Sequence, residues 1–335
     1  MTKSAQSKTV IKLLISLLIL LAAFVLAVSL GAEKLPLSVL FGGGDKFDKI
    51  ILWRLRLPRA LLVLITGILL GGSGAVFQLF FRNPLAEPGI MGISSGATLG
   101  AVLATTVMAG MGAAGSALFS LISPINLCAF IGALAAGSLV TGLAFSRAGR
   151  NSSIMLLLCG TALGTLYSSV GSMILLTSNK ELHSIYTWIL GSFNGRGWNE
   201  LIFILIPAAA AIVIMFCISR PLDLLSGGEA AAASLGVEVN LLRILVLVSG
   251  ALAVSCAVCA GGTIGFVGLI APHIVRKIVG PKGRQLIPFS MIFGAVLLLL
   301  ADTLARLIIA PGELPAGIIT SILGVPFFLS LCLKK

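Results

Sequence analysis

Apolar stretches long enough to cross a membrane recur along this chain of 335 residues. A helix needs about 20 predominantly apolar residues to span the hydrocarbon core of a bilayer. Runs close to that length lie at 13–32, 60–81, 93–112, 119–146, 153–177, 201–219, 242–262, 264–279, 286–305 and 316–333. Because lipid cannot hydrogen-bond the backbone, a spanning run must satisfy its own polar groups as a helix. The sequence predicts an all-α integral membrane protein with ten transmembrane helices in a single transmembrane domain, 1–335.

The composition supports the same class. Hydrophobic residues make up 58% of the chain and charged residues 10%, where a soluble domain has about 25% charged residues. The 39 glycines allow helix backbones to approach closely in lipid, so we expect a tightly packed bundle. The net charge of +12 is spread over loops and helix ends rather than gathered in one run. This distribution fits contact with anionic headgroups and does not predict a nucleic-acid partner.

The distribution of basic residues predicts the orientation. With ten spans both termini lie on one side, and most of the 23 Lys and Arg residues fall on that side. The positive-inside rule therefore places both termini in the cytoplasm. Between Lys34 and Arg59, however, six basic residues fall on the outer side. An acidic partner outside the membrane would account for this exception.

The longest inferred cytoplasmic loop, 220–240, carries its own helical pattern. Pro221 can begin a short helix, and Gly227 and Gly228 interrupt it. Residues 229–235 can form a second helix that Gly236 ends. Two short, Ala-rich helices with a turn would offer a compact knob to the groove of a partner protein. The simpler reading is a helical hairpin on the surface.

No catalytic motif stands out. The chain has no G-x-x-x-x-G-K-[ST] phosphate-binding loop, and its two histidines, His183 and His273, are far apart and lack metal-ligand spacing. Cys256 and Cys259 form a C-x-x-C pair, which can be a redox or metal pair. Without a second pair or a histidine cluster, packing inside a helix is the favoured reading. We therefore expect neither an enzyme nor a metal centre in this chain.

One ionisable pair lies near the end of a span. Asp302 and Arg306 are the closest candidates for a buried ion-coupling relay, which a secondary carrier normally needs. Their i, i+4 spacing also places them side by side on a helix, where they can pair with each other at the membrane edge. We favour the structural pair.

Seven motifs in order resemble the permease subunits of FecCD-type ABC importers, which carry ferric siderophores, haem and cobalamin. The resemblance covers nearly the whole chain. The motifs are Arg56-Leu-Pro-Arg59; Gln78 with Arg82-Asn-Pro-Leu-Ala-Glu-Pro-Gly89; Trp188-Ile-Leu-Gly-Ser192 with Trp198; Gly228-Glu-Ala through Ser234-Leu-Gly-Val237; Gly265-Phe-Val-Gly-Leu-Ile-Ala-Pro-His273 with Arg276; Ala301-Asp-Thr-Leu-Ala-Arg306; and Glu313-Leu-Pro-Ala-Gly317 with Gly324-Val-Pro-Phe327.

The resemblance implies the type II importer permease fold and an assembly in the bacterial plasma (inner) membrane. Two permease subunits, here expected to be a homodimer, would join two cytoplasmic ATP-binding subunits. ATP and Mg would bind those partner chains, and this chain would hold no cofactor. A periplasmic or lipoprotein binding protein would deliver the chelate from outside. We predict import of an iron chelate, with ferric siderophore preferred and haem or cobalamin left open.

The resemblance also assigns site residues. Three arginines would dock the binding protein: Arg56, Arg59 and Arg306. The loop at about 220–240 would couple to the ATPase through Glu229, Ala230, Ser234, Leu235 and Gly236. The fifth and tenth helices would line the pathway with Gly160, Thr161, Gly164, Ser168 and Thr320, and the cytoplasmic gate would include Asn83 and Leu85. The alternative is a stand-alone secondary carrier or channel, which would need a buried ionisable relay and no docking knob.

Overall fold

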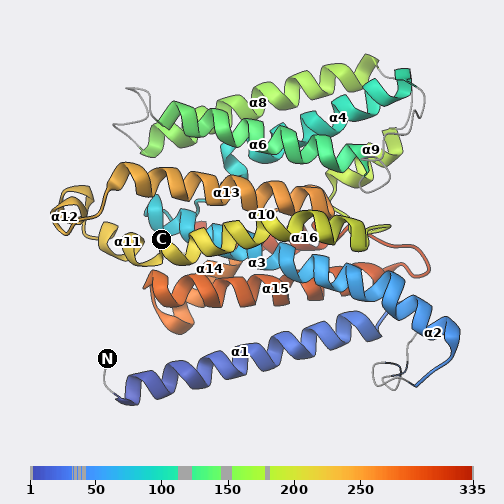
Figure 1. The fold of residues 1–335 in the computed structure, drawn as a ribbon, viewed down its shortest axis with the longest axis horizontal. Helices are drawn as coiled ribbons and strands as arrows, with labels where there is room; N and C mark the ends of the chain where they lie inside the picture. Colours follow the sequence, from blue (N-terminus) through green and yellow to red (C-terminus); the bar gives the residue numbers. More distant parts are fainter. Residues whose placement is uncertain are drawn as a thin grey trace.

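The computed structural model describes residues 3–31, 33, 36, 39, 43–111, 123–144, 153–177 and 182–333, and its regular structure is helical (Figure 1). The longer helices are α1 (Lys3–Ser29), α3 (Leu57–Phe80), α4 (Ile93–Met111), α6 (Pro124–Ala144), α8 (Ser153–Thr177), α10 (Trp198–Cys217), α13 (Val239–Gly261), α14 (Val267–Val279), α15 (Gly283–Ile308) and α16 (Ala316–Leu333). Short helices connect them: α2 (Lys46–Ile50), η2 (Ile51–Arg56), η3 (Pro88–Met91), α9 (Leu182–Ile189), α11 (Ser219–Leu225) and α12 (Glu229–Ser234).

Each predicted span coincides with a helix over the residues that the structure describes. Seven of the described helices are long and apolar enough to cross a membrane. Shorter apolar stretches, Ile93–Thr106 and Ala316–Leu331, lie in α4 and α16. The prediction of an all-helical membrane protein is confirmed.

Helix α14 is shorter than the predicted run 264–279. Its 13 residues rise about 20 Å, less than the ~30 Å of a hydrocarbon core. The chain turns before it, with positive φ angles at Gly262 (73°) and Phe266 (67°). The turn packs against the end of α9, where the Thr263 hydroxyl donates a hydrogen bond to the Ile189 carbonyl. Hydropathy alone could not reveal this turn, because its residues are small or apolar.

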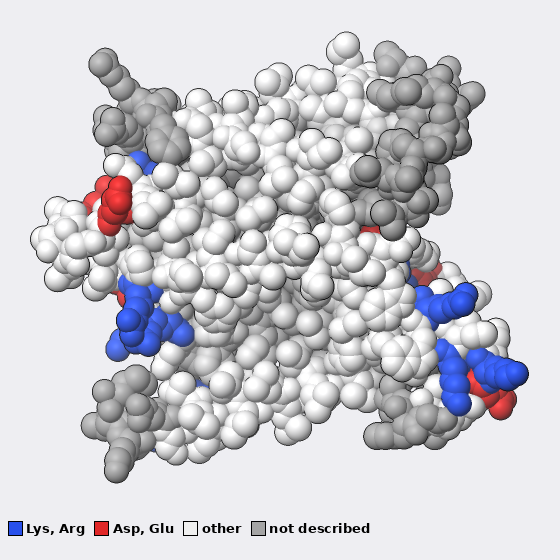
Figure 2. Space-filling view, in the orientation of Figure 1, with Lys and Arg blue, Asp and Glu red and all other residues white. Residues whose placement is uncertain are grey.

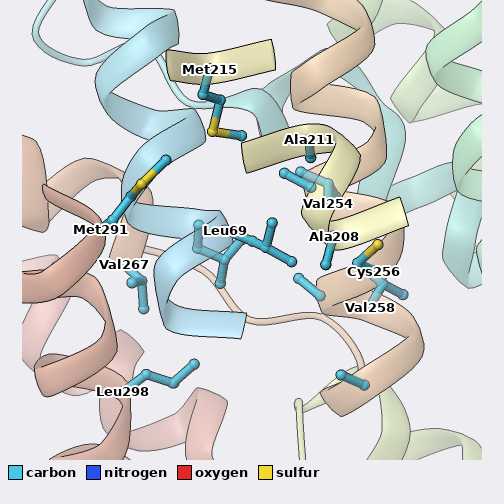
Figure 3. Packing of buried hydrophobic residues seen from close by; sticks show 14 of the residues in the cluster. Leu69, Ala208, Ala211, Met215, Val254, Cys256, Val258, Val267, Met291 and Leu298 are labelled. Atoms are coloured by element: carbon cyan, nitrogen blue, oxygen red, sulfur yellow. The ribbon is translucent and has the colours of Figure 1, made fainter. Parts of the chain in front are cut away.

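Helix α3 is the centre of the bundle. It contacts α1, α10, α13, α14 and α15, and most of its residues are buried. Figure 3 shows how Leu69 of α3 lies among side chains from α10, α13, α14 and α15, such as Met215, Val254 and Met291. A ring of apolar side chains on four surrounding helices thus holds α3 in place.

Glycines on α3 allow neighbouring backbones to touch it. A Cβ at Gly71 would stand 2.2 Å from the Ser290 carbonyl oxygen of α15, and a Cβ at Gly74 would stand 1.9 Å from the Gly268 carbonyl oxygen of α14. Both distances are far below van der Waals contact, and the obstacle is backbone. The expectation of tight small-residue packing is met at these crossings.

Gly74→Ala is therefore expected to destabilise the fold, because α3 and α14 must separate to admit one methyl group. Overpacking of this kind costs about 1–3 kcal/mol. The matched control is Gly142→Ala on α6, where a Cβ meets no atom within 4 Å and better helix propensity adds up to ~1 kcal/mol of stability. Thermal unfolding of the two purified variants measures the difference. Equal midpoints would contradict the close crossing.

Charged side chains gather at the two ends of the bundle, with an uncharged belt between them (Figure 2). One end carries α2, η2 and the first turn of α3, and we call it the α2 end. The opposite end carries α11, α12 and the start of α1 (Figure 1), and we call it the hairpin end. This distribution is the one expected of a protein whose middle lies in hydrocarbon.

Candidate functional site

At the α2 end, helices α3 and α15 and the loop between α15 and α16 bring four charged side chains into one cluster. Arg59 Nη2 lies 2.9 Å from Asp302 Oδ1, and Arg306 Nε lies 3.2 Å from Asp302 Oδ2. Arg59 Nη1 also lies 2.8 Å from Glu313 Oε2. Asp302 is thus held between two guanidinium groups while only 2% exposed. The predicted pairing of Asp302 with Arg306 is confirmed, and Arg59 is an additional partner.

Two arginines at this end bind the last turn of α1. Arg306 donates to the carbonyl oxygens of Ala27 (2.7 Å) and Leu30 (3.0 Å). Arg56 donates to the Ser29 carbonyl at 2.6 Å. The last carbonyls of a helix lack intrahelical donors and form the negative end of its dipole. Arg56 and Arg306 therefore cap α1, and they are 8% and 6% exposed respectively.

Other basic residues at the α2 end are exposed. Lys46 and Lys49 lie on α2, and Arg54 lies on η2 beside the exposed Trp53. The indole of Trp198 donates to the Trp53 carbonyl at 2.9 Å and so fixes η2 to the start of α10. The structure thus brings the three predicted docking arginines to one end, and a second, exposed set of cations lies beside them.

At the hairpin end, α11 and α12 form a two-helix hairpin, as the sequence of 220–240 predicts. Leu222, Leu225 and Ala232 point inward and are completely or almost completely buried. Gly228, with φ of 113°, makes the turn between the helices, and Gly236, with φ of 86°, ends the second one. Both conformations are ones that side chains with a Cβ rarely adopt.

The hairpin is anchored to the bundle by polar contacts. The Gly283 backbone N–H at the start of α15 donates to Asp223 of α11. Arg243 of α13 lies 3.5 Å from the Glu229 carboxylate. The five predicted coupling residues are all exposed on this anchored hairpin: Glu229, Ala230, Ser234, Leu235 and Gly236. Because the hairpin is anchored to α13 and α15, a force applied to its exposed surface by a partner would be transmitted to these helices.

The predicted pathway residues on α8 divide into two groups. Thr161 and Ser168 are exposed in the single chain. Gly160 and Gly164 are buried instead, because a Cβ at Gly160 would stand 2.7 Å from the Cα atom of Met91. The two glycines thus seat η3 against α8. On α16, Thr320 is 1% exposed and its hydroxyl donates to the Gly317 carbonyl.

The predicted gate residues lie in the turn after α3. The Asn83 side-chain oxygen accepts a hydrogen bond from the Leu85 N–H at 2.9 Å, an Asx turn that fixes the loop locally. Arg82 just before it has a φ of 50°. Asn83 is exposed, whereas Leu85 is half-buried.

A cavity of about 560 Å³ lies beside this loop. Its polar lining comes from Glu87 and Ser94, from Thr263 in the turn before α14, and from Ser321 on α16. Burial raises the pKa of the Glu87 carboxyl to about 7, although a hydrogen bond from the Gly268 N–H opposes that shift. The sequence motif contains Glu87, but nothing in its spacing predicts that it lines a cavity.

The described residues contain no group of three or more His, Cys, Asp or Glu side chains that could hold a metal ion. Cys256 and Cys259 lie in the packed core, each fully buried and not in a disulfide. The packing interpretation of this pair is the one that the structure supports.

A bundle of long apolar helices with polar elements at both ends is typical of a multi-pass membrane protein, and comparison with known proteins gives the family. The FecCD transport family model matches residues 14–334. The hemin transport system permease HmuU of Yersinia pestis is 35% identical, over 100% of this chain and 98% of its own. The vitamin B12 import permease BtuC of Salmonella paratyphi A is 39% identical over 96% and 94%. The iron(3+)-hydroxamate permease FhuG of Bacillus subtilis is 35% identical over 99% of each.

A solved structure agrees with the sequence relatives. An inward-facing metal-chelate type ABC transporter superposes with a TM-score of 0.82 at 34% identity, over 96% of this chain and 98% of the other. The chain belongs to the FecCD transport family. It is a permease subunit of an ABC importer, and the ATPase is a separate protein. The prediction of this class from the motifs is confirmed.

Proposed function

We propose that this chain forms the membrane pathway of an ATP-driven importer for an iron chelate, with a ferric siderophore as the cargo. The type II fold would cross the bacterial plasma membrane ten times, with both termini in the cytoplasm. Two copies would form the pathway. Two ATPase subunits, which bind ATP and Mg, would dock inside, and a periplasmic or lipoprotein binding protein would dock outside.

The observation that carries this proposal is the separation of two unlike polar surfaces by one bundle. The α2 end carries the exposed cations Lys46, Lys49 and Arg54, and the hairpin end presents small side chains such as Ala230 and Gly236 on an anchored pair of helices. Helices α3 and α15 run between the two ends and contact each other extensively. A displacement of the hairpin can therefore reach the opposite end through packed helices, as rigid-body switching requires.

The proposed cargo fits the exposed hydroxyl face of α8. Thr161, Thr165, Ser168 and Ser169 are all exposed in the single chain and carry no charge. In a dimer whose pathway is lined by α8 and α16, such a face would let a bulky chelate pass without tight binding. HmuU, BtuC and FhuG are named for hemin, vitamin B12 and iron(3+)-hydroxamate, so we propose a cargo within this range of sizes.

Docking at the α2 end follows from its charge. We place the contact at Arg56, Arg59 and Arg306, with exposed Arg54 at its margin. Acidic groups on the binding protein would steer the encounter and fix its orientation. In the free chain Arg56 and Arg306 hold α1, so charge reversal there would also disturb the fold. Arg54 is exposed and offers a cleaner test.

Arg54→Glu is expected to weaken binding-protein docking and to reduce its salt dependence, because a cation facing an acidic surface becomes an anion. Mutation of a charge at the rim of an interface acts mainly on the association rate. The measurement is therefore the association rate of the binding protein, at low and at physiological salt. Arg284→Glu, at an exposed position at the start of α15 on the opposite end, is the matched control and should leave docking unchanged. Unaltered salt-dependent docking in Arg54→Glu would argue against the α2 end as the receiving surface.

A further inference from the structure

Helix α1 lies at the edge of the bundle and leaves a groove beside it. Within its apolar window only 11% of residues are buried, against 61% for α15. Its main contact is with α15 (Figure 1). Between α1, α14 and α15 the structure has a cavity of about 310 Å³ that opens toward the surface.

The groove is apolar along almost all of its length. Its walls are formed by side chains such as Ile15, Ile19, Phe289 and Phe293. Ser16 adds a hydroxyl, but it donates to the Lys12 carbonyl of its own helix at 2.8 Å. A groove of this kind in the uncharged belt faces hydrocarbon, so an acyl chain is the chemistry that matches its walls.

One cation lines the groove at the hairpin end. Lys12 Nζ donates to the Ile278 carbonyl at 2.7 Å, near the end of α14. An ammonium group has three N–H donors, and this contact uses one of them. It also fixes the ammonium at the mouth of the groove, at the level where the helices leave the apolar belt.

Further lysines lie at the same ends of these three helices. Lys8 lies one turn before Lys12 on the same face of α1, Lys277 is in the last turn of α14, and Lys282 precedes α15. All three are exposed. Basic pockets between membrane helices on one face of the bilayer suit anionic lipid headgroups. An apolar groove that ends at a fixed ammonium is thus complementary to a lipid with an anionic head.

We propose that the groove between α1, α14 and α15 binds one acyl chain of an anionic phospholipid, whose phosphate contacts Lys12. The groove is the gap in the packing between α1 and its neighbours. A lipid that fills this gap would hold α1 against α14 and α15. This site is separate from the pathway and does not depend on the cargo.

The test uses the full-length chain, purified in a mild detergent and supplied with phosphatidylglycerol or phosphatidylcholine of identical acyl chains. Native mass spectrometry counts the lipids retained per chain. We expect one phosphatidylglycerol, preferred over phosphatidylcholine by about fivefold, the ratio that ~1 kcal/mol per basic residue gives. Lys12→Gln should remove this preference, whereas Lys49→Gln at the α2 end should keep it. Equal retention of the two lipids by the unmodified chain would overturn the proposal.

A second pair of variants tests the groove itself. Ile19→Trp places an indole in the groove and should abolish retention, whereas Leu18→Trp adds the same bulk at an exposed position that does not line it. Thermal unfolding should show both variants folded. Equal loss in both variants would contradict the site. A lower dimer fraction in Ile19→Trp with lipid retention unchanged would show instead that a second copy of the chain occupies the groove.

Discussion

Ala230→Trp is expected to uncouple transport from ATP hydrolysis. Ala230 is exposed on α12, so the indole adds bulk to the surface without entering the core. If this surface seats in a cleft of the ATPase, the added bulk keeps the hairpin from closing onto it. Overpacking a fitted contact costs about 1–3 kcal/mol, which corresponds to a loss of about 5-fold to about 150-fold in seating. Substrate-stimulated ATP hydrolysis and uptake in the reconstituted importer would measure this loss.

The matched control is Ala230→Ser, which keeps a small side chain at the same helical position. It should retain near-normal stimulation and uptake, and both variants should unfold at the same temperature as the unmodified chain. If Ala230→Trp retained full stimulated hydrolysis and uptake, the hairpin would not be the coupling element. A loss shared by Ala230→Ser would indicate a helix defect rather than a steric one.

Asp302→Asn is the substitution with the largest expected effect on stability. It removes the negative charge that bridges Arg59 and Arg306 while keeping nearly the same shape. Two guanidinium groups would then face each other at a site where Asp302 is 2% exposed. Breaking a buried ion pair by removing one partner costs about 3–5 kcal/mol. A large fall in the thermal unfolding midpoint in detergent would measure it.

Glu313→Gln is the control for this cluster. Its side chain is 26% exposed, so water compensates for much of the lost charge. Because Glu313 is only partly buried and Arg59 keeps Asp302 as a partner, the midpoint should fall less than in Asp302→Asn. Equal destabilisation by the two variants would show that Asp302 has no special place between the arginines.

The helices could be predicted because each is a long apolar run. The hairpin could also be predicted, since the paired glycines 227 and 228 separate α11 from α12 by local chemistry. Pro221 lies in the first turn of α11, which begins at Ser219, two residues before the predicted start. Such patterns carry secondary structure because their causes are local.

The rest of the site depends on contacts between residues far apart in sequence. Arg59 and Asp302 meet because α3 packs on α15, and no spacing reveals that pairing. The motifs around Arg56 and Arg306 predict arginines that are free to face a partner. The structure buries both against the end of α1, a contact that no sequence spacing predicts. The groove at Lys12 could not be predicted, because it forms only where α1, α14 and α15 pack together.

The central claim is that this chain transports only together with an ATPase and a binding protein. The most direct measurement is uptake into proteoliposomes containing this chain with its ATPase, with the binding protein and labelled ferric siderophore, haem or cobalamin added outside. The account predicts uptake of ferric siderophore that needs ATP and all three proteins. Uptake by this chain alone, driven by an ion gradient, would contradict it and indicate a secondary carrier.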